Sequence, residues 1–432
     1  MAEKKRFFYG WLILLTCILI MGLGYAPLVS CASLFTKPVT EDLGFTRSGY
    51  ALVSTIAALM MAFMSPFIGK IMSKPYMHKA LVVCMIGNCL AYYCYSFAST
   101  LPQFYVTAAC IGFFECGSTM IPVSVLITNW FRKKRGLVMS IAMVGSSIGG
   151  TILSPIIGNL IASQGWRFTY KAVGITRLVI LVPLVLLVIR RTPADMGTKA
   201  YGADEEGETG KARKTEREWN VSLKEVKKKP MFWCFVLGCT LISATAAVIT
   251  QIPASVMDAG YATTTAASIA SLYLFIAIPG KLVLGHIYDR YGVKAGILFG
   301  NTMFFLSVVC LIFIKHQPFL YLMAILPGFS ACIGTVSAPV ITSGIFVTKH
   351  YAEIYGFLSL FPGVGYALGG PLIAPAYDMT GSYNIAWIIA AALSIVMTAF
   401  LLYSYRGSRI CIKGQEETGN TAKIQYNNGK MR

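Results

Sequence analysis

The sequence predicts an all-α membrane protein in which twelve transmembrane helices form two pseudo-symmetric six-helix bundles. Hydrophobic residues make up 56% of the 432 residues and charged residues 13%, about half the charge that is usual in soluble domains. A glycine and proline skeleton also occurs twice, as GLVMSIAMVGSSIGGTILSP at 136–155 and as GFLSLFPGVGYALGGPLIAP at 356–375. A repeat at half the chain length in so apolar a chain is typical of membrane proteins built from two related bundles.

Each predicted span is a mostly apolar run of about 20 or more residues, the length that a helix needs to cross the hydrocarbon core. The first half contains the spans 8–35, 48–73, 79–98, 102–129, 136–163 and 168–190. The second half contains the spans 231–257, 264–288, 294–314, 318–347, 354–377 and 383–405. The first run is too long for the apolar part of a signal peptide, so we interpret it as an uncleaved first helix.

Polar segments divide the chain into its expected domains. Residues 191–230 carry many charges of both signs and predict a linker, with a short amphipathic helix near 219–229. The polar segment 406–432 predicts a disordered tail. We therefore expect an N-terminal bundle at 1–190, a cytoplasmic linker at 191–230, a C-terminal bundle at 231–405 and a cytoplasmic tail at 406–432.

The net charge of +19 follows the topology of the predicted spans. Basic residues gather at every second junction: 4–6, 70–79, 132–135, 190–191, 227–229, 290–294, 349 and 406–409. This pattern predicts a multi-pass protein of the cell membrane with both termini in the cytoplasm. A nucleic-acid partner would need a basic face on a soluble domain, so none is expected.

The sequence contains no pattern that predicts enzymatic chemistry. A Walker-type phosphate loop is absent, no Ser/His/Asp or Cys/His grouping stands out, and there are four histidines. The twelve cysteines lie mostly in apolar spans without a C-x-x-C pair. We therefore expect a non-enzyme with no catalytic residue, metal or cofactor, and a monomer in the lipid bilayer.

The segment 285–292, GHIYDRYG, resembles the loop signature G-x-L-x-D-R-x-G of the major facilitator superfamily. Its counterpart at 69–74 is GKIMSK, with serine in place of the aspartate. Glycine permits a tight turn, and an acidic residue beside a helix end can hold a neighbouring helix. We interpret Gly285, Asp289, Arg290 and Gly292 as a conformational-switch motif; the alternative is a solvated turn.

Three further stretches narrow the resemblance. The segments FYGW at 8–11 and NWFRKKRG at 129–136 are similar to the branch of monocarboxylate transporters and oxalate:formate antiporters, and YDMTGSY at 377–383 is similar to the antiporters of that branch. The resemblance implies a secondary transporter that moves a small organic anion by alternating access, as proton symport or anion antiport.

Lys281 is the first candidate site residue, because it is a cation within a predicted span. Carriers of this branch have an arginine at the matching place, which implies that Lys281 meets the carboxylate of the substrate. The alternatives are an ion pair with a carboxylate of the other bundle and a side chain that extends to the cytoplasm. Cations that relatives carry elsewhere would fall near Gly363 and Val29, where this chain has none. One cation favours a monocarboxylate over a dicarboxylate.

Two other charged residues lie at membrane depth, where a charge costs about 2.5–3.5 kcal/mol or more. Glu115 could carry a proton between two water exposures or could pair permanently with a buried cation, and Arg177 is the partner to suspect. The residues expected to shape the pocket are Tyr25, Asn88, Gln251, Tyr273 and Asn301. Each of these could instead bond to a neighbouring helix.

Two other functions are compatible with the sequence. A proton-coupled, multidrug-type exporter of amphipathic compounds would share the fold, although Lys281 argues against a cationic cargo. A membrane sensor without transport activity is the third possibility, but no recognisable signalling domain occurs in 191–230 or 406–432.

Overall fold

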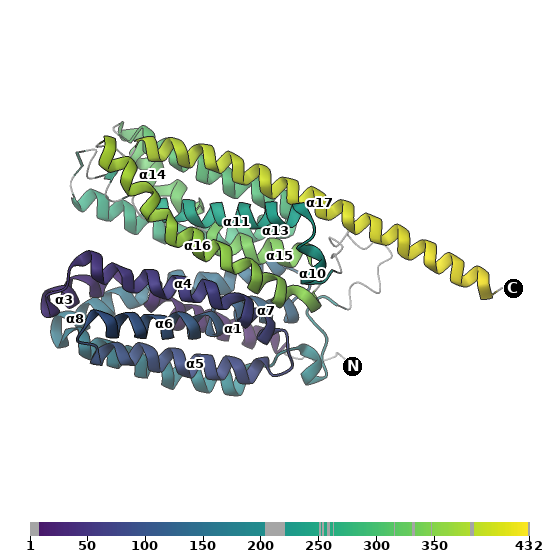
Figure 1. The fold of residues 1–432 in the computed structure, drawn as a ribbon, viewed down its shortest axis with the longest axis horizontal. Helices are drawn as coiled ribbons and strands as arrows, with labels where there is room; N and C mark the ends of the chain where they lie inside the picture. Colours follow the sequence, from purple (N-terminus) through teal and green to yellow (C-terminus); the bar gives the residue numbers. More distant parts are fainter. Residues whose placement is uncertain are drawn as a thin grey trace, which may run out of the picture.

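The computed structural model describes residues 8–203, 221–249, 252, 255–256, 260–261, 263–314, 316–330, 333–346, 348–380 and 384–430. Apart from one isolated β-bridge between Phe131 and Tyr201, the regular elements of these residues are helices. The helices of the described part run roughly along the long axis of the molecule and form two groups, the first half of the chain in one and the second half in the other (Figure 1). The fold is therefore the predicted all-α membrane protein of two six-helix bundles.

The first bundle consists of the helices up to α8. In chain order they are α1 (Gly10–Leu19), the π-helix η1 (Ile20–Tyr25), α2 (Ala26–Val29), α3 (Ser33–Leu43), α4 (Arg47–Met72), α5 (Met77–Cys94), η2 (Tyr95–Phe97), α6 (Leu101–Ser118), α7 (Met120–Trp130) and α8 (Arg135–Val188).

The linker and the second bundle follow. Their described helices are η3 (Pro193–Met196), α10 (Leu223–Val226), α11 (Pro230–Ile249), α13 (Thr263–Ile312), α14 (Gln317–Ser330), the π-helix η4 (Ile333–Ser337), α15 (Ala338–Ile345), α16 (Thr348–Thr380) and α17 (Asn384–Lys430). We call the end of the molecule at which α10 lies the linker end (Figure 1).

Two very long helices each provide two passes, because a glycine interrupts them. Gly165 in α8 has φ 81° and Gly292 in α13 has φ 85°, in the region that favours glycine. Eight runs of the described residues are long and apolar enough to span a membrane, and the 54-residue run Arg135–Val188 is one of them.

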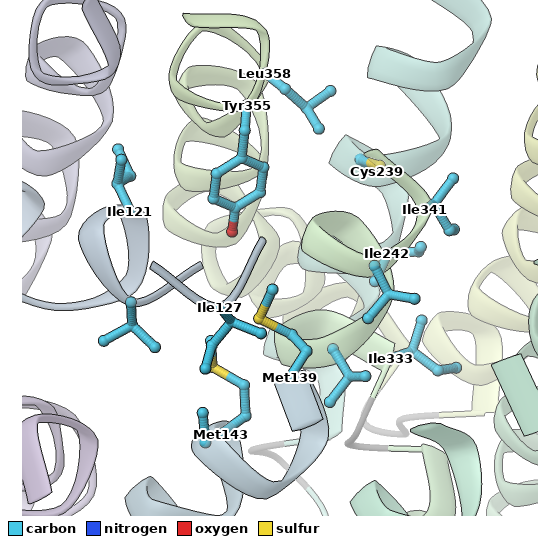
Figure 2. Packing of buried hydrophobic residues seen from close by; sticks show 14 of the residues in the cluster. Ile121, Ile127, Met139, Met143, Cys239, Ile242, Ile333, Ile341, Tyr355 and Leu358 are labelled. Atoms are coloured by element: carbon cyan, nitrogen blue, oxygen red, sulfur yellow. The ribbon is translucent and has the colours of Figure 1, made fainter. Parts of the chain in front are cut away.

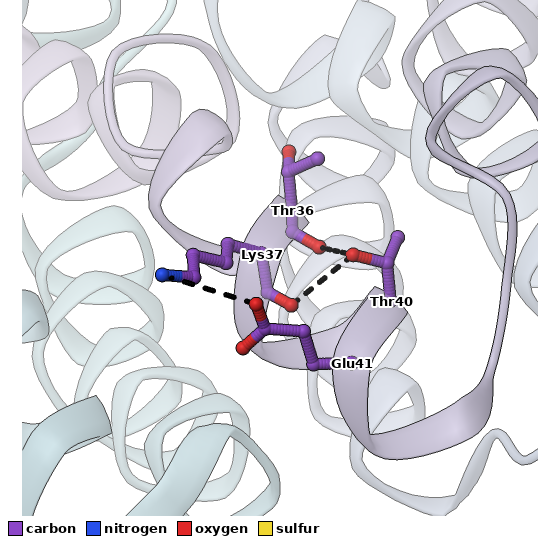
Figure 3. Close-up of polar contacts among 4 residues, drawn as sticks. All are labelled: Thr36, Lys37, Thr40 and Glu41. Carbon is purple, nitrogen blue, oxygen red and sulfur yellow. Dashed lines mark hydrogen bonds and ion pairs between the residues drawn. The ribbon is translucent and has the colours of Figure 1, made fainter.

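The first span ends earlier than predicted. The helix breaks after Val29, and Ser33–Leu43 form the separate helix α3, part of which Figure 3 shows. Lys37 and Glu41 form an ion pair of 3.8 Å on the exposed face of α3, and Thr40 Oγ1 donates to the carbonyl oxygens of Thr36 and Lys37 at 2.8 and 3.1 Å. The opposite face buries Phe35, so α3 is an amphipathic connection rather than the end of the first span.

The linker contains the predicted short helix, whereas the tail differs from the sequence expectation. The linker helix α10 has four residues, and its N-terminus is closed by a capping box between Ser222 and Glu225. The tail is helical rather than disordered, since α17 continues to Lys430. No proline occurs from 406 to 430, so nothing in the chain forces that helix to end.

Two signature segments of the sequence pack on each other at the linker end. Phe8 lies with its ring centroid 6.0 Å from that of Trp130, and Trp11 lies 5.4 Å from Phe131. Tyr201, from the start of the linker, donates its backbone N–H to the carbonyl of Trp130 at 2.9 Å. The aromatic residues therefore attach the first helix and the linker to the end of α7.

The repeated glycines bring helix backbones into contact. Within the first bundle, a Cβ on Gly149 would lie 2.5 Å from Gly22 Cα, and within the second a Cβ on Gly365 would lie 2.6 Å from the carbonyl oxygen of Thr240. Small residues are the usual means of such close approach in lipid. The duplicated skeleton therefore packs each repeat helix against the first helix of its own bundle.

The first glycine of each repeat, Gly136 or Gly356, brings helix backbones of the two different bundles into contact. A Cβ on Gly356 would lie 2.5 Å from Gly69 Cα, and a Cβ on Gly285 would lie 2.7 Å from the carbonyl oxygen of Gly136. Gly356 corresponds to Gly136 in the repeat, so the two crossings are related by the pseudo-symmetry. Both lie toward the linker end of the bundles.

A cluster of buried apolar side chains fills the space between the bundles beside these crossings (Figure 2). We call it the apolar plug; it consists of Ile121, Ile127, Met139, Met143, Cys239, Ile242, Ile333, Ile341, Tyr355 and Leu358. Both bundles contribute side chains to the plug, and the two glycine crossings hold their backbones in contact toward the linker end.

Candidate functional site

Lys281 lies between the two bundles. It is on the first half of α13 and its side chain is buried. Its Nζ donates to three oxygens of α8 in the other bundle: the carbonyl of Met143 at 3.0 Å, Ser146 Oγ at 3.0 Å and Ser147 Oγ at 2.8 Å. These three acceptors are neutral, and Met143 is also part of the apolar plug. The ammonium group therefore lies beside Met143 of the plug and binds one bundle to the other.

Three tyrosines from both bundles lie near one another, although no described contact joins them to Lys281. Tyr25 and Tyr273 are half-buried, and the side chain of Tyr366 is 46% exposed. Tyr366 is within electrostatic range of both other hydroxyl groups, and Tyr25 is also within range of Glu115. Two predicted pocket residues are thus brought together, and Tyr366 joins them.

The sequence contained a signal for Tyr366 that composition alone could not supply. Tyr366 occupies the position in the second repeat that Ser146, an acceptor of Lys281, occupies in the first. The pseudo-symmetry therefore relates Tyr366 to a residue that bonds to Lys281.

Glu115 lies in a second buried cluster, within the first bundle. Asn88 Nδ2 donates to its Oε2 at 2.7 Å, and Thr119 Oγ1 lies 3.0 Å from both its Oε1 and its carbonyl oxygen. Arg177 does not contact Glu115 in an ion pair; its Nη2 donates to Asn88 Oδ1 and, at 2.9 Å, to the carbonyl of Gly24. The suspected pairing of Glu115 and Arg177 is thus indirect, with Asn88 between them.

Arg177 also contacts an aromatic ring. Its guanidinium carbon lies 4.9 Å from the ring centroid of Tyr92. Within the described residues, Nε and Nη1 of Arg177 and the hydroxyl of Tyr92 have no hydrogen-bond partner. The cation is therefore held by one amide, one carbonyl and a ring face.

The remaining predicted pocket residues lie elsewhere. Asn301 is buried and donates from Nδ2 to Thr398 Oγ1 at 2.8 Å, between α13 and α17 of the second bundle. No described contact joins it to Lys281. Gln251 lies outside the described residues.

Asp289 connects the bundles at the linker end. Its Oδ1 accepts from the backbone N–H of Gly136 at 2.8 Å and its Oδ2 from that of Leu137 at 2.7 Å. These groups form the first turn of α8, where unpaired N–H groups and the helix dipole favour an anion. Arg290 lies over the ring of Tyr291 instead, with its guanidinium carbon 5.6 Å from the centroid. The aspartate therefore holds the N-terminus of α8 across the interface.

Replacing Asp289 by asparagine is expected to slow conformational exchange and to leave substrate binding nearly unchanged. The amide has a single acceptor oxygen and no charge, so the contact to the α8 terminus weakens, about two helical turns along α13 from Lys281. Transport should fall several-fold while equilibrium affinity stays within a few-fold, as measured by uptake and by ligand-induced thermal shift.

Asp195→Asn provides the matched control. Asp195 accepts from the N–H of Thr192 at 2.9 Å, within its own short helix rather than across the bundles. Its variant should transport at the native rate. Complete loss of binding in a folded Asp289→Asn protein would contradict the role assigned to Asp289.

Comparisons with known proteins agree with this architecture. The sequence profile of the Major Facilitator Superfamily matches residues 12–268 and 255–424. Monocarboxylate transporter 4 of Gallus gallus is 24% identical over 414 residues, which cover 94% of this chain and 84% of the relative. Monocarboxylate transporter 12 of Mus musculus is 23% identical, with coverage of 91% and 85%.

The chain also resembles solved structures. A crystal structure of the transporter FucP in the outward conformation superposes with a TM-score of 0.67 at 14% identity, covering 91% of this chain and 98% of that one. A second structure, of the E. coli fucose:proton symporter FucP with the N162A substitution, gives a TM-score of 0.66 at 15% identity. At this identity the likeness concerns the fold.

Proposed function

The chain belongs to the major facilitator superfamily of membrane transporters, and from that premise we propose that it moves a small organic anion, a monocarboxylate, by alternating access. The observation that carries the proposal is the position of Lys281, a buried cation bonded across the bundle interface. In this fold class, substrate sites lie near the midplane between the two halves.

A carboxylate has a physical reason to bind at Lys281. The Nζ hydrogens point to hydroxyl and carbonyl oxygens, and charge-assisted bonds to an anionic oxygen are roughly twice as strong as bonds between neutral groups. An arriving carboxylate can therefore replace a serine hydroxyl with a gain in free energy. The ring faces of Tyr25, Tyr273 and Tyr366 would cover the organic part of the substrate.

Access to this site depends on which end of the interface is closed. Ser147 and Tyr366 follow the plug residues Met143 and Leu358 along helices that start at the linker end. The described conformation is closed at that end, so the substrate would enter from the opposite side. Release then requires that the two glycine crossings and the Asp289 contact separate.

Glu115 provides a means of coupling to protons. Protonation removes the negative charge that offsets Arg177, which makes the interior more favourable for an incoming anion. Thr119 suits either state, because its hydroxyl can donate to the carboxylate or accept from the carboxylic acid. This supports proton symport over anion antiport.

The proposal is tested by uptake into proteoliposomes from a panel of labelled monocarboxylates, dicarboxylates and amphipathic cations, with and without a pH gradient. We expect monocarboxylates alone to accumulate, and faster when the outside is acidic. Accumulation of amphipathic compounds without anion uptake would favour the exporter instead. If the protein binds a compound of the panel but transports none of them, the result would favour a sensor.

We further propose that the protein is a monomer of the cell membrane, with both termini, the linker 191–230 and the tail 406–432 in the cytoplasm and with bundles at 1–190 and 231–405. The basic junctions support this orientation. Single cysteines at Glu205 and Asn420 in a cysteine-free protein should not react with a membrane-impermeant thiol reagent in intact cells. They should react after the cells are opened. Labelling of both cysteines in intact cells would show that the orientation is the opposite of the proposed one.

A further inference from the structure

Asn88 lies between the two opposite charges of the first bundle. It is 0% exposed, and its carboxamide contacts Glu115 with one end and Arg177 with the other. These three residues come from α5, α6 and the second half of α8, so the amide joins three separate helices.

The chemistry of the partners fixes how the amide is turned. A guanidinium group only donates hydrogen bonds, so the atom of Asn88 that faces Arg177 must be Oδ1. Nδ2, a donor, must then face Glu115, and the carboxyl oxygen that it reaches must be an acceptor. The amide thus stabilises a Glu115 oxygen that carries no proton and leaves Oε1, beside Thr119, as the position for one.

The amide also keeps the two charges apart. A cation in direct contact with a carboxylate strongly favours its ionised form. The described residues contain one ion pair, between Lys37 and Glu41, so Glu115 and Arg177 interact through Asn88. A bridged pair leaves Glu115 freer to take up a proton than a direct pair would.

The cluster reaches the wall of the proposed pocket. Arg177 donates to the carbonyl of Gly24, in the π-helix η1, and the next residue is Tyr25. π-Helical turns frequently occur at functional sites. A change of charge at Glu115 can therefore be transmitted through Asn88 and Arg177 to the backbone beside the pocket.

We infer that Asn88 is a positioning residue that sets the pH at which Glu115 takes up its proton, by bridging the carboxylate to Arg177. The inference rests on the proposed function for its role in transport, but the bridge itself is a property of the folded chain. The other ionisable groups that face Glu115 are Tyr25, Cys89 and Cys116, and none of them is a cation.

The test is infrared difference spectroscopy of the carboxyl group in purified protein during a pH titration, with Glu115→Gln to identify the signal. In Asn88→Leu the amide donor is lost, and the leucine, which is at least as bulky as asparagine, still separates Arg177 from the carboxylate. The ionised form is then less stable, and the midpoint of protonation should move to higher pH by about one unit or more. Asn88→Asp places a second negative charge beside Glu115 and should also move the midpoint of Glu115 protonation to higher pH.

Asn129→Leu is the matched control, since Asn129 of the first bundle also donates from its amide, to the carbonyl of Arg191 at the start of the linker at 3.1 Å. The midpoint of Glu115 protonation in Asn129→Leu should equal that of the native protein. Thermal unfolding of each variant establishes that it is folded, and the titration needs no substrate. A native midpoint in folded Asn88→Leu or Asn88→Asp overturns the inference even if monocarboxylate transport is confirmed. A native protein that shows no Glu115 signal at any tested pH overturns it as well. A shifted midpoint in a protein that moves no anion would support the bridge and reject the proposed function.

Discussion

Lys281→Gln is expected to abolish binding of the substrate anion while the protein stays folded. A neutral amide is easier to bury than an ammonium group, and glutamine can still donate to Ser146 or Ser147. The lost bond to a buried charge is worth about 2–5 kcal/mol, which corresponds to a loss of affinity of about 30-fold or more. Ligand-induced thermal shift and uptake measure both effects.

Lys281→Arg should retain part of the activity, because the charge persists although the donor geometry changes. Lys171→Gln is the control for loss of a lysine; its Nζ lies over the ring of Phe97 at 5.1 Å, within the first bundle. If Lys281→Gln bound the substrate with native affinity, Lys281 would not be part of the binding site.

Gly356→Leu is expected to prevent closure of the linker end. Even a Cβ would lie 2.5 Å from Gly69 Cα, so a larger side chain must push α4 and α16 apart. The closed conformation would be lost, and transport should fall at least tenfold. With Cys239 as the sole cysteine, a water-soluble thiol reagent should label this buried plug residue rapidly in Gly356→Leu and slowly in the native protein.

Gly158→Leu separates this effect from a general intolerance of leucine in a repeat helix. A Cβ on Gly158 in α8 would meet no atom within 4 Å, so the variant should transport and label as the native protein does. Native transport by Gly356→Leu would show that the crossing does not need to close so tightly.

Composition and the repeat were sufficient to predict the fold, because length and apolarity are the physical requirements for crossing a bilayer. The ends of the helices were less predictable. The break after Val29 lies in an apolar run without a strong local signal, whereas the turn at Gly165 falls in the gap between the predicted spans 136–163 and 168–190. The tail has polar side chains that water can solvate both in a helix and in a disordered chain. Its composition therefore did not predict the helix.

The sequence predicted those site residues whose charge makes burial in the membrane costly. Lys281, Glu115 and Arg177 were recognised because charge at membrane depth needs a reason. Their partners were not, since Asn88 meets Glu115 and Arg177 across 27 and 89 residues of chain. The apolar plug had no signal at all, because its residues resemble those that face lipid.

The central claim is that Lys281 meets the carboxylate of the substrate rather than an internal acid. Its most direct test is equilibrium binding of a labelled monocarboxylate to the native protein, Lys281→Gln, Glu115→Gln and the double variant. We expect binding to be lost in Lys281→Gln and to stay lost in the double variant, because Glu115 bonds to Asn88 and Thr119. Restored binding in the double variant would contradict the claim and identify Lys281 as the partner of Glu115.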